Sequence, residues 1–377
     1  MRYKRQVNGT DRFLFFAPGR VNLMGDHTDY SGGRVLPAAL ALGTWLFVKL
    51  IPEREIRLRS ENLREEKTIA FEKMEYPQKA WTDYPVGVLH ELLQAGWKKT
   101  GMELTYFSDL PLNAGLAASA SMEMVTAFAL NTVFSLGLSA TDLALLSQRA
   151  EQHFVGVQCG IMDQYAIAHA KTGHALLLDC HQMSHKNIPA RFAGYRFVAV
   201  NSHVSRELVR SVYNRRVAEL QQVREVINSF FEVPYLGMLT GEDHEWLDKL
   251  VEDPVLKKRL RHVVNENTRT EMAAEMLGKG DVSAFGRLMY DSHDSLAHDF
   301  EVSCRELDAL VSIAAQTEGV AGARMTGAGF GGCTLNLVHE QAVEDFTQKV
   351  KTGYRKKTGK EAAVYVLSFE GETQVIS

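Results

Sequence analysis

Short apolar runs rich in β-branched and aromatic residues dominate the first third of the chain and predict strands at residues 13–17, 44–50, 55–59 and 104–108. Apolar positions that recur every three to four residues then predict helices at residues 81–98, 119–136 and 141–154. The second of these helices is apolar on most sides, so we expect it to be buried. Ser139 stands where the third helix needs an N-cap.

The rest of the chain continues to mix the two patterns. Apolar runs predict further strands at residues 174–180, 195–202, 323–325, 333–338 and 363–367. Helical periodicity predicts helices at residues 211–231, 265–277, 282–295 and 305–316. This order suits an α+β fold with antiparallel sheets better than regular βαβ winding. Because 377 residues exceed the size at which one core stops growing, we expect two domains, residues 1–180 and 181–377, divided near residues 179–189.

Composition limits the partners that we expect. A net charge of −4, with 45% hydrophobic and 23% charged residues, is typical of a globular protein and offers no basic footprint for nucleic acid or anionic lipid. The N-terminus is basic but lacks the apolar stretch of a signal peptide, and the most apolar window, residues 35–51, is broken by Pro37, Gly43 and Lys49. The four cysteines show no metal-ligand spacing. We therefore expect a cytoplasmic protein with free thiols that binds neither nucleic acid nor membrane.

The densest group of polar residues lies at positions 17–37, between two apolar runs. It contains side chains that can donate to and accept from many hydroxyl groups, namely Arg20, Asn22, Asp26, His27, Asp29 and Tyr30. Several glycines in the same segment let the backbone pass close to a ligand. A polar loop held by rigid strands is a common way to build a binding site. The alternative is a hairpin whose charges only face water.

A second group, residues 110–124, places small residues directly at the start of the apolar helix. The side chains from Gly115 to Ser121 leave the first-turn N–H groups uncovered, and these groups together with the helix dipole favour an anion. Ser119 or Ser121 could add a hydroxyl for a phosphate or for a phosphate-bound Mg²⁺. Equally, the small residues could serve only to let this helix pack tightly.

Two further patterns bear on nucleotide binding. The sequence contains no GxxxxGK[ST] motif, so a nucleotide would be bound without a P-loop. Residues 326–333, TGAGFGGC, fit GxGxxG, but a strand rather than a helix follows them, which excludes a Rossmann site. What remains is a glycine loop between strands, suited to close approach of the backbone to a ligand.

Acidic residues and histidines supply the last candidates. Asp163 lies among apolar residues, where an acid is usually an N-cap or a functional acid or base. Glu151 could be a second acid in the same region, and oxygen ligands of this kind suit Mg²⁺ held mainly through phosphates. His293 and His298 lie off a shared face of a predicted helix, and we interpret them as surface residues.

Three separated motifs agree with one pattern. Residues 19–33, GRVNLMGDHTDYSGG, resemble the galactokinase signature, residues 110–121, LPLNAGLAASAS, resemble a phosphate-binding second motif, and residues 326–333 resemble a glycine-rich third motif. The chain thus closely resembles the galactokinases of the GHMP small-molecule kinase superfamily. Further similar segments, WTDY, CGIMDQ, SVYNRR, VVNENTR and SHDSLAHDFEVSCRELD, extend the resemblance over nearly the whole chain.

The resemblance implies a two-domain α+β fold, with an N-terminal domain like ribosomal protein S5 domain 2, a ferredoxin-like C-terminal domain and the site between them. It also implies Mg²⁺-dependent transfer of phosphate from ATP to the anomeric hydroxyl of galactose. By motif match, Asp163 would take the sugar proton and Arg20 would stabilise charge on the attacking oxygen and the phosphoryl group.

The resemblance also implies the binding residues. The sugar would be held by Asp26, His27, Asp29, Gly160 and Tyr213. Ser119 and Glu151 would hold Mg²⁺. Trp81 and Tyr84 would line the adenine pocket. The phosphates would lie on the helix start, at Gly115, Leu116, Ala117, Ala118, Ser119, Ala120 and Ser121.

Two positions depart from the family pattern. The family usually has Glu at the position of Asp26, and it has GLSSSAS where this chain has GLAASAS. The shorter acid leaves open the same chemistry on another galactose-like sugar, such as N-acetylgalactosamine, a deoxy or amino galactose, or arabinose. The altered second motif leaves open a sugar sensor that binds without turnover. We expect the protein to be a monomer.

Overall fold

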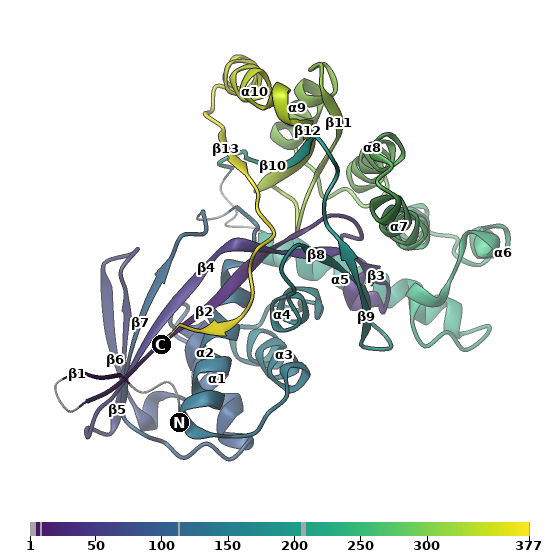
Figure 1. Cartoon of the computed structure of the whole chain (residues 1–377). Helices are drawn as coiled ribbons and strands as arrows, with labels where there is room; N and C mark the ends of the chain where they lie inside the picture. Colours follow the sequence, from purple (N-terminus) through teal and green to yellow (C-terminus); the bar gives the residue numbers. More distant parts are fainter. Residues whose placement is uncertain (1–4, 8–9, 112–113, 205–208, 377) are drawn as a thin grey trace.

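The computed structural model describes residues 5–7, 10–111, 114–204 and 209–376, and it confirms the predicted α+β mixture (Figure 1). Among the described residues the larger sheet has ten strands, and the path β1-β2-β4-β7-β5-β6 forms most of it. These strands are β1 (Arg5–Val7), β2 (Thr10–Asn22), β4 (Pro37–Leu50), β5 (Glu55–Ser60), β6 (Glu65–Ala70) and β7 (Met102–Ser108). Three short strands, β3 (Arg34–Val35), β8 (His174–Asp179) and β9 (Ser184–Pro189), extend it beside β4, and β14 (Gln374–Val375) pairs with β2.

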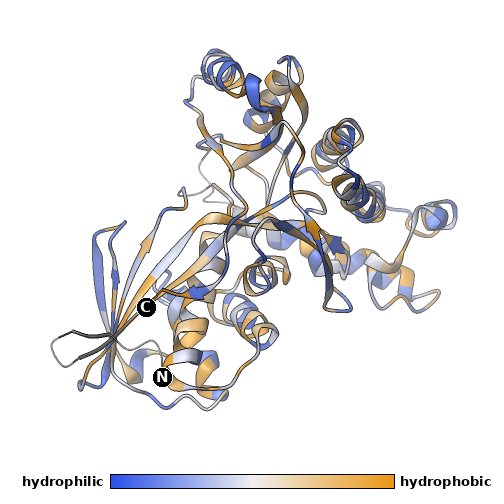
Figure 2. Ribbon diagram, in the orientation of Figure 1, coloured by the Kyte–Doolittle hydropathy of each residue, from blue (hydrophilic) through white to orange (hydrophobic). Residues whose placement is uncertain are grey.

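Helices cover one face of this sheet. The helices α2 (Ala118–Phe134) and α4 (Met162–Ala168) contact β2 and β4, while α1 (Asp83–Gln94) and α3 (Ala140–Arg149) pack against α2. Figure 2 shows hydrophobic residues on the strands and helices of this layer, whereas the outlying β5–β6 hairpin is largely hydrophilic. The apolar side chains of β2, β4, β7 and α2 form a single buried cluster, which explains why α2 is apolar on most sides.

A second, four-stranded sheet has the order β11-β12-β10-β13, and each of its described pairs is antiparallel. Its strands are β10 (Tyr195–Asn201), β11 (Val320–Met325), β12 (Cys333–His339) and β13 (Ala363–Val366). The helices α8 (Val282–His298) and α9 (Arg305–Ala315) contact β11, and α10 (Val343–Thr358) packs on α9. The helices α5 (Val209–Asn228), α6 (His244–Leu250) and α7 (Pro254–Lys279) form a separate group with its own apolar cluster.

The sequence predicted most of these elements. It predicted α7 too short, starting it at residue 265 instead of 254, and it did not predict α4, α6, α10 or the strands β1, β3, β6, β9 and β14. The capping box of Ser139 and Asp142 confirms the predicted start of α3, but the helix ends in a π-helical turn, Ala150–Val155, that positions Glu151. The division into residues 1–180 and 181–377 stays a prediction, and the β8–β9 hairpin, which lies in the larger sheet, crosses it.

Two sequence-based interpretations were wrong. The polar segment at residues 17–37 is not simply a loop, because β2 continues through Arg20 to Asn22 and presents both residues from a strand. His293 is not a surface residue. It is 8% exposed, and its Nδ1 accepts a hydrogen bond from the backbone N–H of Met325, 3.3 Å away, because α8 packs this face on β11.

Among the described residues, no helix combines the length and the apolar character that crossing a bilayer requires.

Candidate active site

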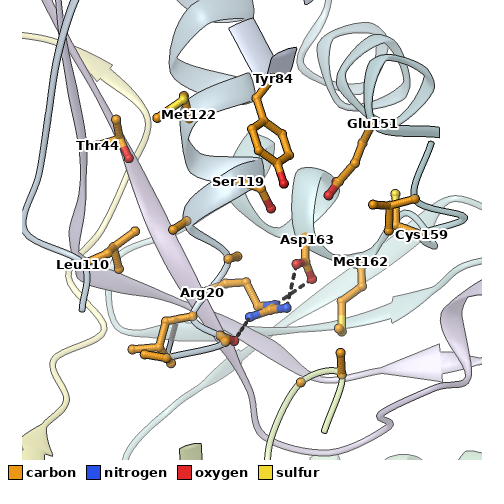
Figure 3. Close-up of a pocket in the computed structure, with 18 of the residues that line it drawn as sticks. Arg20, Thr44, Tyr84, Leu110, Ser119, Met122, Glu151, Cys159, Met162 and Asp163 are labelled. Atoms are coloured by element: carbon orange, nitrogen blue, oxygen red, sulfur yellow. Dashed lines mark hydrogen bonds and ion pairs between the residues drawn. The ribbon is translucent and has the colours of Figure 1, made fainter. Parts of the chain in front are cut away.

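The cavity at the centre of the molecule, about 580 Å³ in volume, is lined by residues from both halves of the chain. The larger sheet and its helices contribute Arg20, Ser119, Glu151 and Asp163, and the second half contributes Tyr213 from α5 and the glycine segment at residues 327–328. Figure 3 shows how the first four converge. Residues more than 300 positions apart in the sequence thus meet at one site.

Arg20 and Asp163 form a bidentate ion pair on the floor of the cavity (Figure 3). The Nε of Arg20 donates to one carboxylate oxygen at 2.7 Å and Nη2 donates to the other at 2.6 Å. The Nη1 of Arg20 donates to the carbonyl of Gly115 at 2.8 Å. The arginine is buried, whereas the Asp163 side chain is 27% exposed, so the carboxylate is fixed in direction yet reachable from the cavity.

The backbone around Gly19 brings the second motif against β2. A Cβ at Gly19 would lie 2.5 Å from Leu110 Cδ2 and 2.6 Å from the carbonyl oxygen of Leu116, so no other residue fits without moving this loop. The N–H of Arg20 donates to the same carbonyl at 3.2 Å. The ladder between β2 and β4 is irregular between Pro18 and Arg20, which turns the Arg20 side chain toward the cavity.

The start of α2 faces the cavity with uncovered backbone donors. Ala117 occupies the N-cap position with φ 61°, and no side chain caps the helix. The first N–H groups of a helix have no intrahelical acceptor, so this start can bind an anion. The side chains of Ala120 and Ser121 are not part of this surface, because Ala120 packs in the core and the Ser121 hydroxyl donates to the Ala17 carbonyl at 2.9 Å.

Ser119 and Glu151 face the same space from α2 and the π-helical turn (Figure 3). Burial, together with the charge of Asp163, raises the pKa of Glu151 to about 7. The Tyr84 hydroxyl also points into this space, on the side of Ser119 and Glu151. Trp81 lines the cavity further out, where its indole N–H donates to Glu65 at 3.0 Å.

Asp29, His27, Tyr213 and Gly160 also line the cavity. A Cβ at Gly160 would overlap the Asp29 carboxylate, so glycine there allows the close approach of the two segments. Burial, together with the charge of Asp163, raises the pKa of Asp29 to about 6. His27 packs between the rings of Tyr213 and Phe300, and burial lowers its pKa to about 3, so the imidazole is neutral.

Asp26 lies at the edge of the cavity and is almost wholly buried. One carboxylate oxygen pairs with Arg324 of β11, and the other accepts the N–H of Gly327 at 3.0 Å. The guanidinium of Arg324 also donates to the Leu23 carbonyl at 3.1 Å, and it lies 3.8 Å from Glu266 of α7. This buried network clamps the loop after β2 onto the second half of the molecule.

Comparison with known proteins identifies the family. Residues 1–50 match the galactokinase galactose-binding signature, residues 83–171 the GHMP kinases N terminal domain, and residues 273–356 the GHMP kinases C terminal domain. A galactokinase of Clostridium beijerinckii is 41% identical over 96% of this chain and 94% of its own, and one of Bacillus subtilis is 39% identical over 94% and 92%. The chain belongs to the galactokinase family.

Solved structures agree with this assignment. A Lactococcus lactis galactokinase, complexed with galactose, matches with a TM-score of 0.93 and 35% identity over 96% of this chain and 95% of its own. A mevalonate kinase of Methanococcus jannaschii matches with a TM-score of 0.67 at 18% identity, which shows a shared fold alone.

The galactokinase motifs therefore meet at one cavity, and sequence reasoning missed three residues around it. Arg324, Glu123 and Gln164 are all buried. Each gave a weak signal, because a polar or charged residue inside an apolar strand or helix needs a partner there. The sequence could not show which partner, since Arg324 pairs with Asp26 from the other end of the chain.

Proposed function

We propose that this chain transfers the terminal phosphate of ATP to the anomeric hydroxyl of galactose, giving galactose 1-phosphate and ADP. Its membership of the galactokinase family supports the reaction. The observation that carries the residue assignment is the Arg20–Asp163 pair, which places a fixed carboxylate and a cation beside the uncapped start of α2. Phosphoryl transfer depends chiefly on positioning and charge stabilisation, and this arrangement provides both.

The proposed roles follow from the geometry. Asp163 accepts the proton of the anomeric hydroxyl as the sugar oxygen attacks the terminal phosphorus, and Arg20 stabilises the charge on that oxygen and on the phosphoryl group. The first-turn N–H groups of α2 bind the phosphates. His27, Asp29, Gly160 and Tyr213, which also line the cavity, hold the sugar.

The residues present also fit Mg²⁺. The Ser119 hydroxyl and the Glu151 carboxylate are hard oxygen donors on one side of the cavity. No group of three or more His, Cys, Asp or Glu side chains in the described part of the chain suits a metal ion, so the protein would hold Mg²⁺ jointly with ATP phosphates. When bound, the ion neutralises charge on these phosphates.

The position of Asp26 favours a second candidate, the same reaction on another galactose-like sugar. Both of its carboxylate oxygens already accept from Arg324 and Gly327, which reduces its capacity to bind a sugar hydroxyl. A sugar that differs from galactose next to Asp26 would then lose little binding affinity.

Release of ADP from Mg²⁺-ATP over a panel of sugars tests both candidates. The panel contains galactose, N-acetylgalactosamine, 2-deoxygalactose, galactosamine and arabinose. The proposed function predicts the highest kcat/KM with galactose. A higher kcat/KM with another sugar would select the second candidate. Binding of galactose and ATP, with turnover no greater than that of Asp163→Ala, would show a sensor instead.

A further inference from the structure

A buried hydrogen-bond network extends from Glu151, one of the proposed metal ligands, to two residues that the proposed reaction does not use. It consists of Glu123 on α2, Gln164 on α4 and Glu151 on the π-helical turn. Glu123 and Gln164 are fully buried, and Glu151 is 7% exposed. The Nε2 of Gln164 donates to Oε2 of Glu151 at 2.7 Å and to Oε2 of Glu123 at 3.0 Å. One amide nitrogen thus bridges two carboxyl groups.

The network is placed by the same helices that form the site. Glu123 follows Ser119 by one helical turn, so both residues point from the same side of α2. Gln164 follows Asp163 directly in the first turn of α4. A shift of this amide would therefore move the carboxylate of Glu151, which lines the cavity and points toward Ser119 (Figure 3).

The charges of the network explain why an amide stands at its centre. Among the described residues, no Lys, Arg or His forms an ion pair with Glu123 or Glu151. Burying carboxyl groups without a hydrogen-bond donor is costly, and Gln164 supplies a donor to each. The Oε1 atoms of Glu123 and Gln164 have no partner in the part of the chain that the structure describes. The Gln164 amide is therefore the contact through which Glu123 is connected to the site.

We propose that Gln164, anchored by Glu123, is a positioning residue that orients the Glu151 carboxylate for the metal ion bound with the nucleotide. By holding one carboxylate oxygen in the protein interior, it leaves the remainder of the group directed toward Ser119 and the cavity. The inference rests on the proposed function, because it assigns Glu151 to that metal. Outer hydrogen-bond partners of metal ligands commonly change metal affinity by about 10–100-fold.

The test measures binding of Mn²⁺ in the presence of ADP by electron paramagnetic resonance, beside galactose binding by calorimetry. Gln164→Leu keeps the approximate size of the side chain and removes both donated hydrogen bonds. We expect it to weaken Mn²⁺ binding by about 10-fold, with galactose affinity changed less than about two-fold. Asn131→Leu is the matched control, since it removes an amide at the other end of α2 that bonds the backbone of Leu138 at 3.0 Å.

A second pair of variants tests the anchor, and it keeps the inference testable if Gln164→Leu does not fold. Glu123→Gln retains an oxygen that accepts from Gln164, so we expect Mn²⁺ affinity within about two-fold of wild type. Glu123→Leu removes the acceptor and should weaken Mn²⁺ binding several-fold, in the same direction as Gln164→Leu.

The outcomes are distinguishable. If wild type binds Mn²⁺ with ADP but Gln164→Leu, or Glu123→Leu in its place, binds it as tightly, the positioning role is wrong. If Glu123→Gln loses as much affinity as Glu123→Leu, the anchoring role is wrong. If wild type itself shows no Mn²⁺-dependent ADP binding, the failure lies in the proposed function instead.

Discussion

Asp29 lines the cavity and is proposed to bind the sugar, and burial together with the charge of Asp163 raises its pKa to about 6. The pKa of Asp29 in the folded protein lies above its ordinary value of 3.8. Its contribution to folding stability is therefore greatest below pH 3.8 and is lost as pH rises through about 6. The ionised form, present above about pH 6, is the better acceptor for sugar hydroxyl groups. Stability and sugar binding therefore change in opposite directions over the same pH range.

The variant Asp29→Asn tests whether pH changes folding stability and sugar binding in opposite directions. The variant removes the buried charge, so its melting temperature should exceed that of wild type at pH 7.5 and approach it at pH 4. The KM of wild type for galactose should rise as pH falls through about 6, whereas the KM of the variant should be higher and nearly flat with pH. Calorimetry and initial rates between pH 4.5 and 8 measure both. A wild-type KM without a change near pH 6 would contradict the assignment.

Arg324 and Asp26 form a deeply buried ion pair at the edge of the cavity, with side chains 0% and 1% exposed. Removing one partner leaves the other charge uncompensated, which costs about 3–5 kcal/mol at buried pairs. Arg324→Met should therefore lower the free energy of unfolding by about this amount. In Arg324→Met/Asp26→Asn the buried charge is gone, so the double variant should lose less than the sum of the two single variants. Urea unfolding of the four proteins measures this, and additive losses would contradict it.

Among single residues, the sequence predicted those whose chemistry differs from that of their neighbours in the chain. Arg20 lies in a dense polar segment, Asp163 and Glu151 are acids that stood out in their surroundings, and all three line the cavity. The partner of Asp26 could not be predicted, because Arg324 is separated from it by 298 positions and only the fold brings them together. His293 was misplaced for the same reason, since its burial depends on how α8 packs against β11.

Among the elements, the approach of α4 to the loop after β2 depends on Gly160. A side chain there would displace the Asp29 carboxylate. Gly160→Ala should raise the KM for galactose by about 10-fold or more, equivalent to about 1.4 kcal/mol, while the KM for ATP changes little. Gly278→Ala is the control, because a Cβ at that position in α7 meets only Ile188 at 3.9 Å. An equal rise in both KM values would indicate general disruption instead.

Helices whose apolar residues recur at a clear helical spacing were predicted from the sequence. Helices in which charged residues obscure this spacing were not. In α10 the buried residues Phe346, Val350 and Tyr354 recur every fourth position, but lysines and other polar residues around them obscure this spacing in the sequence. The first half of α7 was missed because charged residues surround its buried Leu260 and Val263. In α10 a narrow apolar stripe is enough to pack one side of the helix, whereas α7 also buries polar residues such as Arg259 and Glu266.

On the scale of the whole molecule, the chain returns at its end to the sheet where it began. In Figure 1 the segment after β13 descends from the smaller sheet to β2, where β14 pairs Gln374 with Phe16. Gly371 packs against the Leu40 carbonyl, and Glu372 accepts from Thr172 at 2.9 Å. This segment is the last connection between the two sheets, which together enclose the site.

Truncation after Glu370 tests that connection. The shortened chain loses the β14 pairing and the bond to Thr172, so its melting temperature should fall by a few degrees, as expected for about 1–2 kcal/mol in a protein of this size. Because none of residues 371–376, which the structure describes, lines the cavity, kcat at 25 °C should stay within about two-fold of wild type. An unchanged melting temperature would show that the segment does not stabilise the fold.

The monomeric state and the cytoplasmic location stay predictions.

In the proposed function, the Arg20–Asp163 pair directs phosphate from ATP to the anomeric oxygen of galactose. The most direct test is ³¹P NMR of wild type and Asp163→Asn with Mg²⁺-ATP and galactose, beside calorimetric binding of galactose to each. We predict equal amounts of ADP and galactose 1-phosphate with wild type. With Asp163→Asn we predict formation slower by about 10²–10⁴-fold and galactose binding retained. A product phosphorylated on another hydroxyl, or an Asp163→Asn rate equal to that of wild type, would contradict it.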